Sequence, residues 1–296
     1  MAVWPEDYIE KVVKDVEKYN GVRKVVKAGL IERCVIKNCA PERIHPNPID
    51  EFSQPDIGPN LGIVGDYVKL INYNESQELP IFKEPLIVQK MEPDGYLLLN
   101  GHHRWFAAIR MRVKKIHIQI INLITENDLS RMINKTKNTK LATFDFDEVL
   151  LLRDESNQAP LRDSLFCKKI KERLRVGAPE VIKAFADNGY DICVYTASYL
   201  TEEDFEDFFS MYELKVDVVV NGINEKRKNT AGGTQNLKEM IREKYKHIVH
   251  VDNESVVCTN RVTKNYEIYE IPDEETWEEG IKNIIKVIAD NYEENI

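Results

Sequence analysis

The stretch LATFDFDEVLL, residues 141–151, has the pattern of a buried β-strand that ends in carboxylates. Largely apolar residues run from Leu141 to Phe144, and Asp145 and Asp147 follow two residues apart. Parallel α/β sheets bind ligands at the carboxyl ends of their strands. Two acidic side chains placed together there are costly unless a cation neutralises them, and carboxylate oxygens suit Mg²⁺. The stretch therefore predicts a strand of a parallel sheet and a divalent-metal site.

Strand and helix patterns alternate from this stretch to the end of the chain. Strands are predicted at 190–198, 216–220, 247–253 and 265–271, and helices at 176–188, 200–212, 234–245 and the C-terminus. Such alternation predicts a parallel sheet flanked by helices. The insert between Asp147 and Thr196 is short, so we expect a small cap domain or none.

Polar side chains also follow the later strands of this half. Thr196 and Ser198 end the segment VYTAS, Asp252 ends HIVHVD, and Lys238 opens the helix after the turn AGGTQN. Together with Asp145 they supply a nucleophile, a hydroxyl donor, a metal-ligand carboxylate and a cation. These are the groups that phosphoryl transfer requires.

The segments FDFDEV, VYTAS and HVDN, together with Lys238, resemble in order and kind the four motifs of haloacid dehalogenase-like (HAD) phosphatases. FDFDEVLL, RVGAPEVIKAF and DICVYTASY are most similar to the small CTD-type members. The resemblance covers about residues 141–265 and implies a Rossmann-like core.

The resemblance also implies a role for each matched residue. Asp145 would attack phosphorus and form an aspartyl phosphate, and Asp147 would act as the general acid and then the general base. Thr196 and Lys238 would hold the phosphoryl oxygens and neutralise charge. Asp145, Asp147 and Asp252 would bind Mg²⁺.

The match departs from the family pattern at two places. Asn253 follows Asp252 where a second acid is common, which leaves Glu254 as an alternative ligand. Lys226 and Lys228 are alternatives to Lys238 as the cation. A doubly wound domain with exposed acids and no catalytic role is the competing interpretation.

A second motif lies in PDGYLLLNGHHRWFAAIRM, residues 93–111, which predicts a strand, a tight turn and a helix. Unpaired first-turn amides and the helix dipole bind anions, phosphate above all. Arg104 adds a bidentate fork, and His102 and His103 add donors or acid/base groups near neutral pH. Gly101 would let a ligand approach the backbone closely. The turn therefore predicts a phosphate site.

The order of strand, NGHHR and Ala-rich helix resembles the ParB/sulfiredoxin-like fold over residues 31–123, with RIHPNP as its early motif. That family includes chromosome-partition CTPases, sulfiredoxin and a free serine kinase. The resemblance implies a nucleotide-phosphate site for ATP, ADP or CTP, formed by Asn100, Gly101, His102, His103 and Arg104. Asn100 replaces the usual aspartate. The acid that serves as base in the kinase branch would be Glu51, Asp50 or Asp56.

The chain is therefore expected to be α/β, with two domains and a linker. An α+β ParB/sulfiredoxin-like domain is predicted at 1–131, a polar linker at 132–140, and a Rossmann-like HAD domain at 141–296. Within the first domain we expect helices at 6–28, 64–73 and 102–111, strands at 85–91, 96–99 and 115–123, and an ordered, proline-rich loop at 40–62.

Composition restricts the compartment and the partners. The chain has 296 residues and five scattered cysteines without a CxxC pair, which are typical of reduced thiols in a cytoplasmic protein. No apolar run of membrane-spanning length is present, and the N-terminal segment lacks the apolar core of a signal peptide. The net charge of −9 arises in the second half, which weighs against non-specific nucleic-acid binding.

These observations predict an Mg²⁺-dependent HAD-type phosphohydrolase coupled to a nucleotide-binding or phosphotransfer domain, and acting on a small phosphorylated metabolite or a nucleotide. One alternative is a nucleic-acid protein whose first domain binds or cuts the chain while the HAD domain trims terminal phosphates. Another is a non-catalytic regulator that senses a nucleotide.

Overall fold

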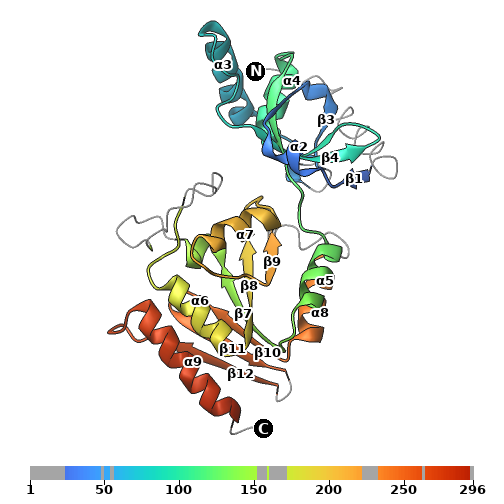
Figure 1. Ribbon diagram of the computed structural model, residues 1–296. Helices are drawn as coiled ribbons and strands as arrows, with labels where there is room; N and C mark the ends of the chain where they lie inside the picture. The colour runs from blue at the N-terminus through green and yellow to red at the C-terminus, as the bar shows by residue number, and fades with distance from the viewer. Residues whose placement is uncertain are drawn as a thin grey trace. The chain divides into compact units, whose positions relative to one another are not determined.

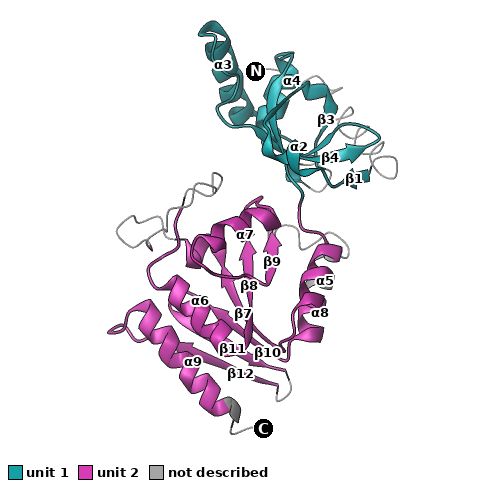
Figure 2. Ribbon diagram, viewed as in Figure 1, with its two compact units in different colours: residues 1–122 teal, residues 123–296 magenta. Residues whose placement is uncertain are grey.

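The chain divides into two compact units, Met1–Asn122 and Leu123–Ile296 (Figure 2). The computed structural model describes residues 24–47, 50–53, 57–151, 159, 172–221, 233–261 and 264–293. Each unit contains helices and a sheet with parallel strands. The predicted α/β class is therefore confirmed.

The first unit is built on a mixed sheet of order β2-β6-β4-β5-β3, with β1 pairing the end of β4. Figure 1 labels β1, β3 and β4 of this sheet. Its strands are β1 (Lys24–Val26), β2 (Lys37–Cys39), β3 (Ile44–His45), β4 (Leu86–Glu92), β5 (Tyr96–Asn100) and β6 (Ile116–Ile120). Its helices are α2 (Leu30–Cys34), α3 (Leu61–Ser76) and α4 (His102–Arg110), with 3-10 turns at Pro41–Arg43 and Glu51–Ser53.

The predicted strand–turn–helix of this unit is present. β4 and β5 form an antiparallel hairpin, and β5 leads into α4 through Gly101, whose φ is 97°. Ala107 and Ala108 of α4 are fully buried against the sheet residue Leu98, so small side chains let the helix lie close to the strands.

The second unit has a sheet of order β12-β11-β10-β7-β8-β9. Its strands are β7 (Lys140–Asp145), β8 (Tyr190–Thr196), β9 (Val218–Asn221), β10 (His247–Val251), β11 (Ser255–Asn260) and β12 (Asn265–Glu270). Its helices are α5 (Glu126–Lys135), α6 (Ala178–Asp187), α7 (Glu202–Ser210), α8 (Gly233–Lys244) and α9 (Trp277–Glu293), with a π-helical turn at Phe146–Leu150. β10, β7, β8 and β9 are parallel, whereas β11 and β12 extend the sheet antiparallel.

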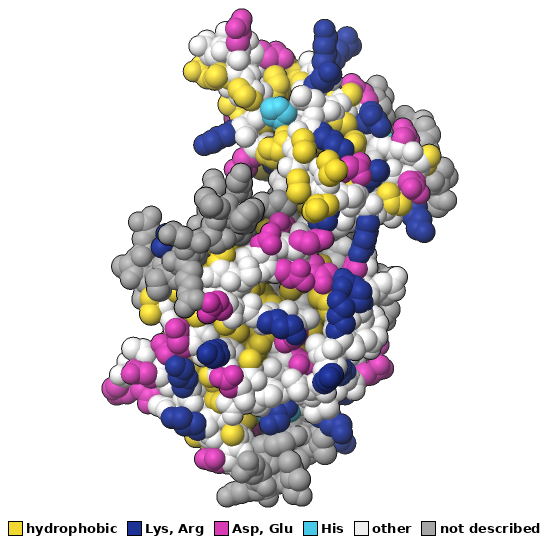
Figure 3. All heavy atoms as spheres, viewed as in Figure 1, with side chains coloured by type: hydrophobic (Ala, Val, Ile, Leu, Met, Phe, Trp, Pro, Cys, Tyr) yellow, Lys and Arg dark blue, Asp and Glu magenta, His cyan; other side chains and the backbone are white. Residues whose placement is uncertain are grey.

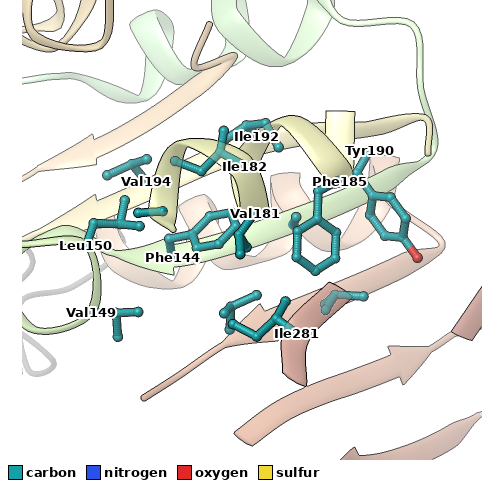
Figure 4. Close-up of a cluster of buried hydrophobic side chains, with 14 of the residues drawn as sticks. Phe144, Val149, Leu150, Val181, Ile182, Phe185, Tyr190, Ile192, Val194 and Ile281 are labelled. Carbon is teal, nitrogen blue, oxygen red and sulfur yellow. The ribbon is translucent and has the colours of Figure 1, made fainter. Parts of the chain in front are cut away.

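Helices cover both faces of the parallel strands. Side chains from α6, α7 and α9 form one core with Phe144, Ile192 and Val249. Figure 4 shows the part of this core where Phe144 of β7 and Phe185 of α6 meet edge to face, with ring centroids 5.8 Å apart. A second core joins α5 and α8 to the opposite face of the same strands. Strands buried on both faces account for the continuous apolar runs in the sequence.

Three of the sequence expectations are wrong. Residues 132–135 were assigned to the linker but belong to α5, because Met132 and Ile133 are buried in the core with α8. The boundary between the units falls between Asn122 and Leu123.

The other two errors concern strands. The predicted helix 6–28 ends in β1, whose Val25 and Val26 pair with β4; residues 1–23 lie outside the described residues. The strand β11 was missed because its segment SVVCTN follows HIVHVDN after a turn too short to separate two patterns.

Candidate functional site

Strand register brings three predicted residues to one edge of the second sheet. Asp145 pairs with Tyr195 and so lies beside Thr196 on β8. Phe144 pairs with Val251, which places Asp252 level with Asp145. Neighbouring strands lie about 4.8 Å apart, so the side chains that leave these strand ends share one region. It is the point where the parallel order reverses around β7, the usual ligand site of such sheets.

The carboxylate of Asp147 is bound by the end of β8. The hydroxyl of Thr196 donates to its Oδ2 at 2.7 Å, and the amide of Ala197 donates to the same atom at 2.9 Å. The hydroxyl of Ser198 donates to Oδ1 at 2.8 Å. Thr196 is only 2% exposed, so the partly exposed Asp147 is joined to a buried residue of the second predicted motif. From the sequence, Ser198 was grouped with Thr196 as a hydroxyl donor, without a specific role of its own.

A π-helical turn presents these acids. It runs over Phe146–Leu150, and Leu151 donates its amide to the carbonyl of Phe146 at 3.0 Å. Such turns are rare and occur often at functional sites. Phe146 anchors the turn, because its ring is 1% exposed and packs against Phe205, Phe208 and Phe209, three aromatic residues of α7. Asp145 and Asp147, on either side of Phe146, are held at the surface.

Two carboxylates of the predicted metal set fit Mg²⁺, and the third does not. Asp145 accepts the amide of Glu148 through Oδ1, and Asp252 accepts the amide of Asn253 through Oδ1; the second oxygen of each accepts no hydrogen bond from the described residues. Mg²⁺ commonly takes one or two carboxylates and completes its shell with waters and phosphate. Both oxygens of Asp147 are already engaged. Within the described ranges, no group of three or more His, Cys, Asp or Glu side chains is arranged to hold a metal.

The remaining candidates of this half are placed as follows. Lys238 lies in α8, in a part whose side chains are outside the described residues, and Lys226 and Lys228 lie outside them altogether. Glu254 is exposed in the turn after β10. Residues 152–158 and 160–171 of the insert between Asp147 and Thr196, where a small cap or none was expected, are likewise outside the described residues.

One contact beside this edge had no signal in the sequence. The guanidinium of Arg175 donates to Oδ1 of Asn253 at 2.8 Å and lies 4.2 Å from the ring centroid of Trp277. These residues come from the segment before α6, the turn after β10 and the start of α9. Only the fold brings them together.

In the first unit, both histidines of NGHHR accept hydrogen bonds from the proline-rich loop. Nε2 of His102 accepts the amide of Asn47 at 3.3 Å, and Nε2 of His103 accepts the amide of Asn60 at 3.1 Å. The ring of Phe52 contacts both imidazoles, with centroids 5.4 Å away. The histidines therefore attach the loop to α4.

Burial keeps these imidazoles neutral. It lowers the pKa of His102 to about 4, although Asp50, whose Oδ2 lies 3.8 Å from Nδ1, opposes the shift. Burial also lowers the pKa of His103. The interpretation of these residues as acid/base groups near neutral pH does not agree with this geometry, because an accepting nitrogen must stay unprotonated.

Gly101 and Arg104 also serve internal packing. A Cβ on Gly101 would lie 2.4 Å from Cδ2 of Leu86, so glycine is needed for the helix to approach β4 rather than for a ligand to approach the backbone. Arg104 donates through Nη1 to the carbonyl of Glu84 at 2.8 Å. Asn100 is exposed at the end of β5.

The candidate bases of this unit do not converge on one position. Asp50 accepts the amide of Phe52 through Oδ1 and faces His102 through Oδ2. Glu51 is exposed in the turn Glu51–Ser53, and Asp56 lies outside the described residues.

A groove of about 840 Å³ lies at the opposite, amino-terminal edge of the second sheet. Its lining includes Asn138, Lys183, Tyr190 and Asp191. The buried carboxylate of Asp191 is bound by Asn138 and Tyr245. The groove is therefore separate from the edge that carries Asp145 and Asp252.

No family model matches this chain, and no curated protein matches it. In the part of the chain that the structure describes, no helix is both long and apolar enough to cross a membrane. Functional assignment therefore depends on the chemistry of the sites described above.

The buried imidazole of His102 predicts a loss of stability in acid. Its folded-state pKa of about 4 lies below its unfolded value of 6.5, so its contribution is complete above pH 6.5 and is lost as the pH falls toward 4. The lost free energy of unfolding is on the order of 3 kcal/mol. Urea unfolding at pH 7 and pH 4.5 should show a smaller pH dependence for His102→Gln than for wild type.

The exposed His117 on β6 provides the matched control, and His117→Gln should behave like the wild type. An identical pH dependence in the wild type and His102→Gln would contradict the role assigned to this imidazole.

Proposed function

We propose that the second unit is an Mg²⁺-dependent phosphohydrolase of the HAD type that acts on phosphomonoesters through an aspartyl phosphate. The observation that carries the proposal is the register around β7, which aligns Asp145, Thr196 and Asp252 at the carboxyl edge of the sheet. The resemblance of FDFDEV, VYTAS and HVDN to the family motifs supports the same reaction.

Asp145 is the proposed nucleophile. Its Oδ1 accepts the amide of Glu148 at 2.8 Å, which fixes the carboxylate, while Oδ2 accepts no hydrogen bond from the described residues. Oδ2 would attack phosphorus and release the alcohol of the substrate. Bound Mg²⁺, held by Asp145 and Asp252, would neutralise charge on the phosphoryl oxygens.

Asp147 is the proposed general acid and base. Three donors from residues 196–198 orient its carboxylate, which lies two residues along the chain from the proposed nucleophile. It would protonate the leaving alcohol and then take a proton from the attacking water. Thr196 contributes by holding Asp147, and Lys238 is the proposed cation for the phosphoryl oxygens.

One prediction concerns the proposed nucleophile, Asp145. Asp145→Asn should reduce hydrolysis of a generic aryl phosphate in Mg²⁺ by several orders of magnitude, because an amide cannot form the acyl phosphate. Steady-state kinetics would measure the loss. Asp187→Asn, an exposed aspartate at the end of α6, is the matched control and should stay near wild type. Near-normal turnover by Asp145→Asn would refute the proposed function.

Another prediction distinguishes Asp252 from Glu254 as the Mg²⁺ ligand after β10. Asp252→Asn should raise the Mg²⁺ concentration needed for half-maximal activity, because the affinity for a hard cation follows the charge of its oxygen ligands. Glu254→Gln should leave the Mg²⁺ titration unchanged. The reverse result would transfer the ligand role to Glu254.

For the first unit we propose a phosphate-binding role at the start of α4, with a nucleotide such as ATP, ADP or CTP as the ligand. Support comes from the start of α4, where no side chain of the described residues caps the helix at Gly101, and from the guanidinium of Arg104, which lies beside Gly101. His102 and His103 take no direct part in this proposal, because their Nε2 atoms hold the loop.

Calorimetry on the full chain tests this role, with Asp145→Asn present so that the nucleotide is not hydrolysed. Arg104→Ala should weaken nucleotide binding roughly ten- to a hundred-fold, since one charge-assisted hydrogen bond contributes about 1.5–3 kcal/mol. Arg110→Ala, an exposed arginine at the other end of α4, is the control. Equal affinities for all three proteins would rule out the site.

A nucleic-acid substrate is less favoured. On the face drawn in Figure 3, basic and acidic side chains are interspersed and form no continuous basic stripe. Hydrolysis of 3′- or 5′-phosphorylated oligonucleotides in preference to small phosphomonoesters would support the alternative of nucleic-acid end processing.

A further inference from the structure

Arg175 occupies an unusual position beside the proposed active edge. Its side chain is half-buried, and burial lowers the pKa of its guanidinium. No carboxylate of the described residues forms an ion pair with it. Its guanidinium instead contacts the amide oxygen of Asn253, the carbonyl of Val149 and the ring of Trp277. Partial burial of a cation costs free energy unless an anion pairs with it. The contacts of Arg175 among the described residues are all neutral, which suggests that they serve another purpose.

The first contact fixes the turn after β10. Nη1 of Arg175 donates to Oδ1 of Asn253 at 2.8 Å, and the backbone amide of Asn253 donates to Oδ1 of Asp252 at 2.7 Å. The orientation of the Asp252 carboxylate therefore depends on the position of the Asn253 residue. Arg175 restrains that residue through its side chain.

Trp277 holds the same turn from a second direction. Its Nε1 donates to the backbone carbonyl of Asp252 at 3.0 Å, while its ring lies under the Arg175 guanidinium. The start of α9 reaches this position because Gly177 has no side chain: a Cβ there would lie 2.6 Å from Cβ of Glu278. The cation and the indole thus hold the Asp252 turn between them.

The network continues to the turn that carries the other acids. The side-chain amide of Asn253 donates to the carbonyl of Glu148 at 3.3 Å, and Arg175 reaches the carbonyl of Val149 at 3.4 Å. Both carbonyls belong to the π-helical turn between Asp145 and Leu151. One guanidinium therefore contacts both turns that bear the proposed metal ligands.

We propose that Arg175 is a positioning residue that sets the spacing between the carboxylates of Asp145 and Asp252, and so the affinity of the site for Mg²⁺. The proposal rests on the function proposed above. Arg175 touches neither carboxylate, and acts through Asn253 and Trp277. Loss of such indirect support commonly weakens metal binding or activity about 10- to 100-fold.

The closing experiment measures Mg²⁺ binding directly, by calorimetry with Mg²⁺ alone, on the full-length protein. Arg175→Ala should bind Mg²⁺ about 10- to 100-fold more weakly than wild type. Trp277→Phe keeps an aromatic face for the cation but loses the N–H donor, and should weaken binding in the same direction by less. Arg131→Ala, which removes an exposed arginine paired with Glu202 in the same unit, is the control and should match wild type.

Two further readouts distinguish positioning from a general structural role. In Arg175→Ala, kcat on an aryl phosphate should recover at saturating Mg²⁺ while KM for the phosphate stays unchanged. Arg175→Ala and Asn253→Ala should not be additive in Mg²⁺ affinity, because both remove the same path. Equal falls in kcat at all Mg²⁺ concentrations, or additive effects, would overturn the proposal.

The outcomes separate this inference from the proposed function. A wild type that binds Mg²⁺ and hydrolyses phosphate, with a folded Arg175→Ala that binds Mg²⁺ equally well, overturns the inference alone. A wild type that does neither overturns both. If Arg175→Ala does not fold, Arg175→Lys and Trp277→Phe decide: the proposal requires weaker Mg²⁺ binding in both, and wild-type binding in both overturns it.

Discussion

Repulsion between carboxylates at one sheet edge is the constraint that shapes the second unit. Asp145, Asp147 and Asp252 leave neighbouring chain segments within a small region, and like charges there oppose folding. Each carboxylate accepts hydrogen bonds that offset this repulsion, and Asp145 and Asp252 each accept one nearby backbone amide. Asp147 accepts the most hydrogen bonds, two from hydroxyls and one from an amide. These contacts join the turn after β7 to the end of β8. The second oxygens of Asp145 and Asp252 accept no hydrogen bond from the described residues, which leaves them for a metal ion.

The first unit meets a related problem with neutral groups. Its proline-rich loop has few regular backbone partners, and two imidazoles accept amides from it. Because those nitrogens must remain unprotonated, burial and loop order support each other. In the sequence these residues indicated a phosphate site, because histidine, arginine and glycine at the start of a helix are also the components of an anion-binding site. Composition alone does not distinguish an acceptor that holds a loop from a donor that holds a ligand.

Local patterns predicted much of the fold. The alternation around 141–271 gave the parallel strands, and the hairpin before NGHHR is present, because periodicity and turn residues act over short distances. The helix α5 was missed, since its polar surface outweighs the few residues it buries. The alignment of Asp145 with Thr196 and Asp252 was anticipated from strand ends. The contacts of Arg175 were not, because Asn253 and Trp277 are distant in sequence and no spacing rule relates them.

The aromatic anchor of the π-helical turn has a consequence for how activity responds to heat. Phe146 fixes that turn to α7 through three phenylalanine rings, whereas the strands are joined also by their own backbone pairing and by packing against α6 and α9. Loosening of α7 would shift Asp145 and Asp147 while leaving the strand pairing intact. Thermal inactivation would then precede melting of the sheet, and the operating range of the protein would be set by the cohesion of one small aromatic cluster.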